Sequence, residues 1–275
     1  MQHASAPEIF DSRRRRAQWE RVDRRGAGSR FLLEMLADDI ADRLDCTTRN
    51  FENCLITGPL ARTADAILGS KVKQWTAQPF SDEDNLGVET HSFDLIISAG
   101  TLDSVNDLPG ALVQIRRALR PDGLFLGAMF GAGTLTALKK AMLLADGARA
   151  ASHIHPQIEL RAAADLLTRA GFTLPVADKT GTDVRYGDWR TLVNDLRDAG
   201  AGNCLRGMRP FLGRDYVGRL DNAWSILADP SEKVSERFEI LHLSGWAPSP
   251  DQPKPARRGS GTVSLAAMLD KSGKI

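Results

Sequence analysis

The stretch of sequence that decides the fold is Ser92-Phe93-Asp94-Leu95-Ile96-Ile97-Ser98. Its nearly continuous apolar run predicts a central β-strand buried on both faces. A helix with apolar residues at helical spacing follows, with Asp107 as its N-cap and Pro109 in its first turn. We then expect a turn at Arg120-Pro121-Asp122-Gly123 and a second buried strand from Leu124 to Phe130. This order of elements predicts an α/β fold.

The flanking sequence extends the same pattern into βα units around a mainly parallel sheet. Further apolar runs predict strands, and Ala- and Leu-rich stretches between them predict helices. The expected strands are 51–57, about 71–75, 172–177 and 238–243, and the expected helices are 60–68, 135–150 and 157–170. We expect the last two strands to pair antiparallel, because a helical stretch separates them.

Three segments are expected along the chain. Residues 1–50 predict an N-terminal helical segment, and residues 51–247 the α/β domain. Within that domain, residues 180–230 predict a helical insert that lies beside the sheet. Residues 248–275 begin with four prolines up to Pro255 and predict an extended tail, with Arg257 and Arg258 as its contact residues.

Composition excludes several classes of protein. Of the 275 residues, 36 are Lys or Arg and 35 are Asp or Glu, so the net charge of +1 argues against a nucleic-acid binder. No apolar run is long enough to cross a bilayer. The three cysteines have no CxxC spacing, so we expect no disulfide framework, no metal site and a reducing, cytoplasmic setting.

The central stretch, from Ser92 through Leu119-Arg120-Pro121-Asp122-Gly123-Leu124, resembles the class I S-adenosylmethionine-dependent methyltransferases. This resemblance implies a Rossmann-like class I methyltransferase sheet with a helical insert before the last strand. It also implies that ligands bind at the carboxyl ends of the strands.

Motifs at both ends of the chain resemble one family within that class, the methyltransferase-type respiratory complex I assembly factors, which are related to the biotin-synthesis malonyl-acyl-carrier-protein methyltransferases. The motifs are Ile9-Phe10-Asp11 before Arg13 to Arg16, Asn194-Asp195-Leu196-Arg197, Gly245-Trp246, and Gln252-Pro253-Lys254-Pro255. The resemblance implies a protein substrate, such as a respiratory complex subunit, and arginine hydroxylation as the reaction. It also implies a cytoplasmic place at the inner membrane, held there through the partner.

The S-adenosylmethionine site that the resemblance implies departs from the family pattern. Ile56 stands where the first strand should end in an acid, Gly58 is the one glycine of its loop that matches, and we expect the second strand to end at Trp75-Thr76 without a carboxylate. We therefore expect S-adenosylmethionine affinity to be much reduced or absent. The cofactor contacts that the resemblance implies are Thr57, Gly58, Trp75, Asp82, Ala99 and Gly100.

Several other side chains have a functional and a structural interpretation. Asp103 follows the central strand and is either a base or a loop-capping residue. His153-Ile154-His155 suggests a metal site, but no third ligand is evident. Tyr186 and Cys54 are more simply core residues. The arginines between Arg13 and Arg25 fit either an acidic partner or a solvated helix face. No catalytic base is identified.

Three readings of the function remain open. The first is an assembly factor that modifies or binds a protein substrate. The second is an active methyltransferase on a small molecule or an acyl-carrier thioester. The third is a non-enzymatic assembly module that keeps the fold and has lost the cofactor. Cofactor binding and the mass of the product separate the three.

Overall fold

The computed structural model describes residues 8–25, 30–78, 85–148, 151–207 and 212–252. Six strands and eight α-helices are assigned within these residues. The strands are β1 (Phe51–Thr57), β2 (Val72–Gln78), β3 (Phe93–Ala99), β4 (Leu119–Phe130), β5 (Thr173–Tyr186) and β6 (Val234–Trp246). The helices are α1 (Ser12–Arg25), α2 (Phe31–Asp45), α3 (Ala64–Leu68), α4 (Leu108–Ala118), α5 (Thr136–Asp146), α6 (Leu160–Ala170), α7 (Trp189–Asp198) and α8 (Arg214–Leu227).

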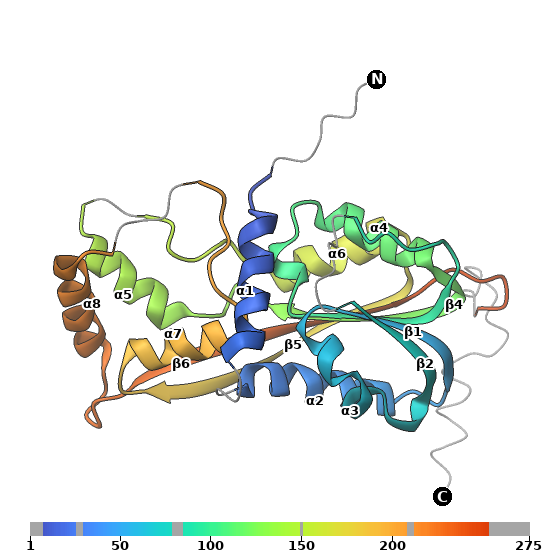
Figure 1. The fold of residues 1–275 in the computed structure, drawn as a ribbon, viewed down its shortest axis with the longest axis horizontal. Coiled ribbons are helices and arrows are strands. Elements are labelled where there is room, and N and C mark those ends of the chain that lie inside the picture. The colour runs from blue at the N-terminus through green and yellow to red at the C-terminus, as the bar shows by residue number, and fades with distance from the viewer. Residues whose placement is uncertain (1–7, 26–29, 79–84, 149–150, 208–211, 253–275) are drawn as a thin grey trace, which may run out of the picture.

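One mixed sheet runs through the molecule in the order β2-β1-β3-β4-β6-β5 (Figure 1). The first four strands are parallel, and β6 is antiparallel to both β4 and β5. The expected α/β class, the central position of β3 and the antiparallel last pair are confirmed.

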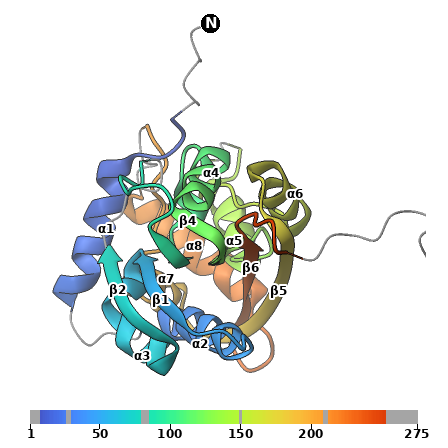
Figure 2. The same cartoon turned by 90° about the vertical axis from the view of Figure 1, so that its right-hand side faces the viewer.

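Helices cover both faces of the sheet, as the alternation of side chains along β3 requires. Leu95 and Ile97 pack into the core beneath α2, α3 and α5. Ile96 points to the opposite face and packs with α4 and α6. Figure 2 shows α4 and α6 on one side of the sheet and α2 and α3 on the other. The N-terminal helix α2 is therefore part of the main core.

The helical insert is shorter than expected, because β5 continues through Tyr186. Residues 180–186 pair with β6 from Ile240 to Val234, so they are strand and not helix. The helices of the insert, α7 and α8, lie between the two strands in sequence. Extended pairing with β6 overrides the expectation that the helical insert begins at residue 180.

The expected turn at residues 120–123 is a bulge inside β4. Phe93 pairs with Leu119 and Leu95 pairs with Leu124, so β4 carries extra residues at this point. Asp122 has a positive φ of 61° there, which an aspartate tolerates better than most residues. Its backbone N–H donates to Ala247 O, which holds the bulge against the end of β6.

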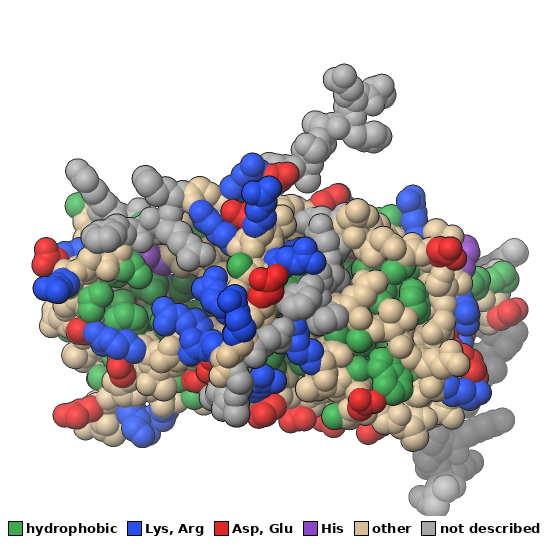
Figure 3. Space-filling view, in the orientation of Figure 1, with side chains coloured by type: hydrophobic (Ala, Val, Ile, Leu, Met, Phe, Trp, Pro, Cys, Tyr) green, Lys and Arg blue, Asp and Glu red, His purple; other side chains and the backbone are tan. Residues whose placement is uncertain are grey.

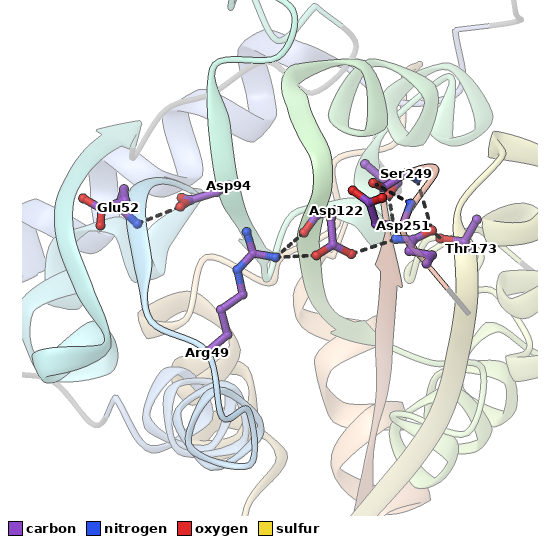
Figure 4. A network of polar contacts seen from close by, with 9 residues as sticks. Arg49, Glu52, Asp94, Asp122, Thr173, Ser249 and Asp251 are labelled. Atoms are coloured by element: carbon purple, nitrogen blue, oxygen red, sulfur yellow. Dashed lines mark hydrogen bonds and ion pairs between the residues drawn. The ribbon is translucent and has the colours of Figure 1, made fainter. Parts of the chain in front are cut away.

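The bulge is also the anchor for the start of the tail (Figure 4). Arg49 pairs with the Asp122 carboxylate at 2.9 Å. The amide of Gln252 donates to the other Asp122 oxygen at 3.0 Å and accepts from Thr173 Oγ1 at 2.8 Å. Residues 248–252 are thus docked on the sheet at the amino ends of the parallel strands. The predicted contact residues Arg257 and Arg258 lie outside the described residues.

Candidate functional site

Two loops meet where β1 and β3 end, at the place expected for the cofactor. Thr57 ends β1 and pairs with Ser98, next to Ala99 at the end of β3. Gly58 and Gly100 follow with positive φ angles of 80° and 76°. Four of the predicted cofactor residues, Thr57, Gly58, Ala99 and Gly100, therefore lie together.

Of the other two predicted residues, Trp75 does not join them in the structure. Trp75 pairs with Cys54 in the middle of β2, three residues before that strand ends. The expectation that β2 ends at Trp75-Thr76 is wrong, because the strand continues to Gln78, whose carbonyl accepts from Gly58 N at 3.1 Å. A cofactor role for Trp75 stays a prediction. Asp82 lies outside the described residues.

Neighbouring atoms pack closely against Gly58 and Gly100. A Cβ on Gly58 would lie 2.5 Å from Thr101 Cγ2 and 2.9 Å from Ala99 O. A Cβ on Gly100 would lie 3.3 Å from Pro59 Cγ. Gly58 and Gly100 thus allow two loops to pack on each other, which is a structural use of glycine.

The polar groups at these strand ends also fit S-adenosylmethionine poorly. Ile56 is completely buried, and Thr57, Ala99 and Thr101 are almost completely buried, so the wall between β1 and β3 is closed. Neither β1 nor β2 ends in a carboxylate that could accept hydrogen bonds from a ribose or an amino group. The described ends of β1 and β2 therefore lack the carboxylates that the methyltransferase resemblance implies for this cofactor.

A cavity of about 310 Å³ opens beside this closed edge, between the end of β4 and the helices α1, α5 and α7. Of the predicted cofactor residues that the structure describes, none lines it. Most of its wall is apolar, and arginines from two helices lie among its polar residues. The apolar wall includes Phe130, Leu135, Leu138, Met142, Val193 and Leu196, and the polar part includes Gln18, Arg21, Arg25, Asp103, His153, His155, Arg197 and Asn203.

The N-terminal part of the chain ties the loops at this end together. Arg15 is 4% exposed and donates to Ser104 O, in the loop after β3, at 2.8 Å. Phe10 forms a β-bridge with Leu205, beyond the insert helix α7. Asp11 N also donates to Cys204 O at 2.9 Å. These contacts explain why α1 lies across the middle of the molecule in Figure 1.

Asp103 and His155 form an acid–imidazole contact in the wall of the cavity. The His155 Nε2 atom lies 3.9 Å from Asp103 Oδ2, and both side chains are more than nine-tenths buried. Burial alone would lower the pKa of His155, but the contacts with Asp103 and Cys204 have the larger combined effect and raise this pKa to about 10. The imidazole is therefore protonated near neutral pH. A protonated imidazole can donate a proton but cannot accept one, so His155 is not a general base in this state.

The second histidine of the pair has separate partners. His153 Nε2 lies 2.8 Å from Asp146 Oδ1 and 3.1 Å from the hydroxyl of Tyr216. Burial, together with the Asp146 carboxylate, raises the pKa of Tyr216 to about 12, so its hydroxyl stays protonated. No group of three metal-binding side chains occurs in the described part of the chain.

Comparisons with known proteins now give the class. A methyltransferase-domain family model matches residues 11–175. A candidate methyltransferase from Bacillus halodurans shares the fold, with a TM-score of 0.50 and 12% identity over 76% of this chain and 99% of that one. The fold is therefore that of the class I methyltransferases.

Relatives then give the particular family. The zebrafish (Danio rerio) arginine hydroxylase NDUFAF5 is 32% identical over 91% of this chain and 75% of its own length. The human protein is 32% identical over 97% of this chain and 84% of its own length. The malonyl-acyl-carrier-protein O-methyltransferase of Xylella fastidiosa is 34% identical over 62% of this chain and 57% of its own. This chain belongs to the NDUFAF5 arginine-hydroxylase family, which confirms the expected resemblance to complex I assembly factors.

Proposed function

We propose that this protein modifies an arginine of a protein substrate during assembly of a respiratory complex, and that it does so without transferring a methyl group. One observation carries the proposal. The alignments with the zebrafish and human hydroxylases cover nine-tenths of the chain or more, so they must extend beyond residues 11–175 into the insert and β6. The alignment with the malonyl-acyl-carrier-protein methyltransferase covers 62%.

The closed strand-end edge supports a reaction other than methyl transfer. A methyl donor must reach its acceptor with its sulfonium centre correctly oriented, and that needs a held nucleoside. At the described strand ends, Thr101 and Pro59 occupy the space beside Gly58 and Gly100. The predicted cofactor residues Thr57, Gly58, Trp75, Asp82, Ala99 and Gly100 could support at most a weak S-adenosylmethionine site.

The partner and the compartment follow from the same relationship. A net charge of +1 gives no general attraction for nucleic acid. The described residues contain no helix that is long and apolar enough to span a membrane. Cys46, Cys54 and Cys204 are free thiols, which suits a reducing compartment. We place the protein in the cytoplasm, at the inner membrane through its partner, whereas the animal relatives are named as mitochondrial proteins.

The test is the mass of the modified substrate in the native host. Respiratory complex I would be purified from cells with and without this gene, and the arginine-containing peptides of its subunits would be compared by mass spectrometry. The proposal expects one arginine that carries an extra oxygen atom only when the gene is present. Re-introducing the gene should restore the oxygen.

Each other outcome points to a different function. Loss of a methyl group instead of an oxygen would overturn the proposal in favour of methyl transfer. Incomplete assembly with no change of mass would favour the non-enzymatic module. One feature of the cavity wall favours the non-enzymatic module, because the raised pKa of His155 makes that imidazole a poor general base.

A further inference from the structure

The cavity between α1, α5 and α7 has a polarity that does not suit the side chain of a substrate arginine. Among the described residues that line it, three have guanidinium groups, Arg21, Arg25 and Arg197, and one has a carboxylate, Asp103. The Asp103 carboxylate already faces His155. A second cation would be repelled by its surroundings, so the cavity calls for a different occupant.

Two of the three arginines have no carboxylate partner among the described residues. The Arg21 Nε donates to a carbonyl of its own helix, Ala17 O, and Arg197 donates to the neutral amide of Asn194. Arg25, in contrast, is paired with Asp198. Arg21 and Arg197 therefore leave two uncompensated positive charges at the rim of the cavity.

Behind this rim the cavity is predominantly apolar. Leu138, Phe130 and Leu196 are nearly or completely buried, and they form a wall with the partly buried Val193 and Met142. Figure 3 shows basic side chains gathered over α1, next to a hollow in which apolar side chains are visible. The volume of about 310 Å³ corresponds to on the order of ten water molecules. A ligand of about ten non-hydrogen atoms fits this space.

We propose that this cavity binds an amphipathic anion, a medium-length hydrocarbon chain that ends in a carboxylate, with the chain against Leu138 and Val193 and the carboxylate between Arg21 and Arg197. Apolar burial binds the chain, and charge-assisted hydrogen bonds from the two guanidinium groups select the anion. The site is separate from the strand-end edge at Gly58. It does not depend on which reaction the protein performs.

The proposal is tested with three probes that share one hydrocarbon chain. Octanoate, octanol and octylammonium would be titrated into the full-length protein by calorimetry at low salt. We expect octanoate to bind with a dissociation constant of about 1 mM or tighter, octanol to bind roughly tenfold more weakly, and octylammonium not to bind. Raising the salt should weaken octanoate binding and leave octanol binding unchanged.

Variants locate the binding site within the protein. R197Q and R21Q should each weaken octanoate binding about three- to tenfold without changing octanol binding. The matched control is R24Q, because Arg24 is an exposed arginine of α1 that does not line the cavity. V193F should fill the cavity and weaken both probes. Circular dichroism and melting would show that each variant is folded.

Three results would overturn the proposal. One is octanol binding as tightly as octanoate, which would leave no role for the arginines. Another is R24Q weakening octanoate as much as R197Q, which would indicate a nonspecific surface charge effect. The last is a folded V193F that binds octanoate like the unmodified protein, which would place the ligand elsewhere.

Discussion

The carboxyl edge of the sheet has two regions that differ in what fills them. Between β1 and β3, Gly58 and Gly100 let two loops close on each other, with Thr101 and Pro59 in the space between them. Beyond the end of β4, helices α1, α5 and α7 stand apart and leave a cavity. The comparison teaches that a glycine in a strand-end loop predicts a ligand site only together with its acidic neighbours. Without them, the same glycine can serve loop packing.

The largest expected effect is the loss of S-adenosylmethionine affinity at the closed region. Two missing carboxylates remove charge-assisted hydrogen bonds of about 1.5 to 3 kcal/mol each. At about 1.4 kcal/mol per tenfold, this loss turns a micromolar site into roughly a millimolar one. Calorimetry on the unmodified protein should therefore detect weak binding or none. A micromolar dissociation constant would show that the edge between β1 and β3 opens.

The next effect separates loop packing from backbone strain. G58A introduces a Cβ 2.9 Å from the carbonyl of Ala99, which is backbone and cannot easily move, and it also strains a φ of 80°. We expect a loss of roughly 3 kcal/mol in the free energy of unfolding by urea. G69A is the control, because Gly69 also has a positive φ, 49°, but has no neighbour within 4 Å. G69A should cost about 1 to 2 kcal/mol, from backbone strain alone.

A double variant sharpens this comparison. Thr101 Cγ2 would lie 2.5 Å from the new Cβ, and T101S removes that methyl group while it keeps the hydroxyl near Ser98. G58A/T101S should recover part of the stability that G58A loses. If G58A and G69A lost the same unfolding free energy, the space beside Gly58 would be open, as it would be in an intact cofactor site.

The sequence predicts the sheet well because the pattern that decides it is local. The alternation in β3 and the capping of α4 by Asp107 Oδ1 depend on neighbours within a few residues. Gly171 likewise ends α6 in the left-handed conformation that glycine adopts easily. The bulge at Asp122 was mistaken for a turn, because a turn and a bulge use the same residues, and pairing with β3 and β6 decides between them.

The cavity was not predictable from the sequence in the same way. Asp103 and His155 each had a possible function, but they are 52 positions apart, and only the fold brings them together. Arg197 belongs to an insert whose length was overestimated. The one available signal was the high arginine content of α1, which fits an acidic partner and a solvated helix face equally well. The burial of Tyr186 and Cys54 does agree with their expected place in the core.

A smaller effect concerns the cavity wall and depends on pH. The folded-state pKa of His155 is raised to about 10, chiefly because the contacts with Asp103 and Cys204 outweigh burial, which lowers it. A raised pKa stabilises the folded state fully below the unfolded value of about 6.5, and this stabilisation is lost as the pH rises through about 10. Unfolding by urea at several pH values should show H155Q approaching the unmodified protein as the pH rises.

The difference in unfolding free energy between H155Q and the unmodified protein should narrow by at least about 1.4 kcal/mol, the equivalent of one pKa unit. D103N is the matched variant, because it keeps the imidazole and removes the carboxylate that raises its pKa. D103N should reduce the pH dependence. A constant difference between H155Q and the unmodified protein from pH 6.5 to pH 10 would mean that His155 is neutral and available as a base.

The smallest effect lies at the opposite end of the same strands and tests whether the cavity is independent. Q252A removes an amide that donates to Asp122 and accepts from Thr173, at a cost of about 1 kcal/mol in unfolding free energy. The neighbouring D251A is the control, because no hydrogen bond found among the described residues uses the Asp251 carboxylate, and it should cost almost nothing. Neither variant should change octanoate affinity, since Asp122 lies at the start of β4 and the cavity lies at its end. If Q252A weakened octanoate binding as much as R197Q, the two ends of the sheet would be coupled, and the arginines alone would not account for the selectivity of the cavity.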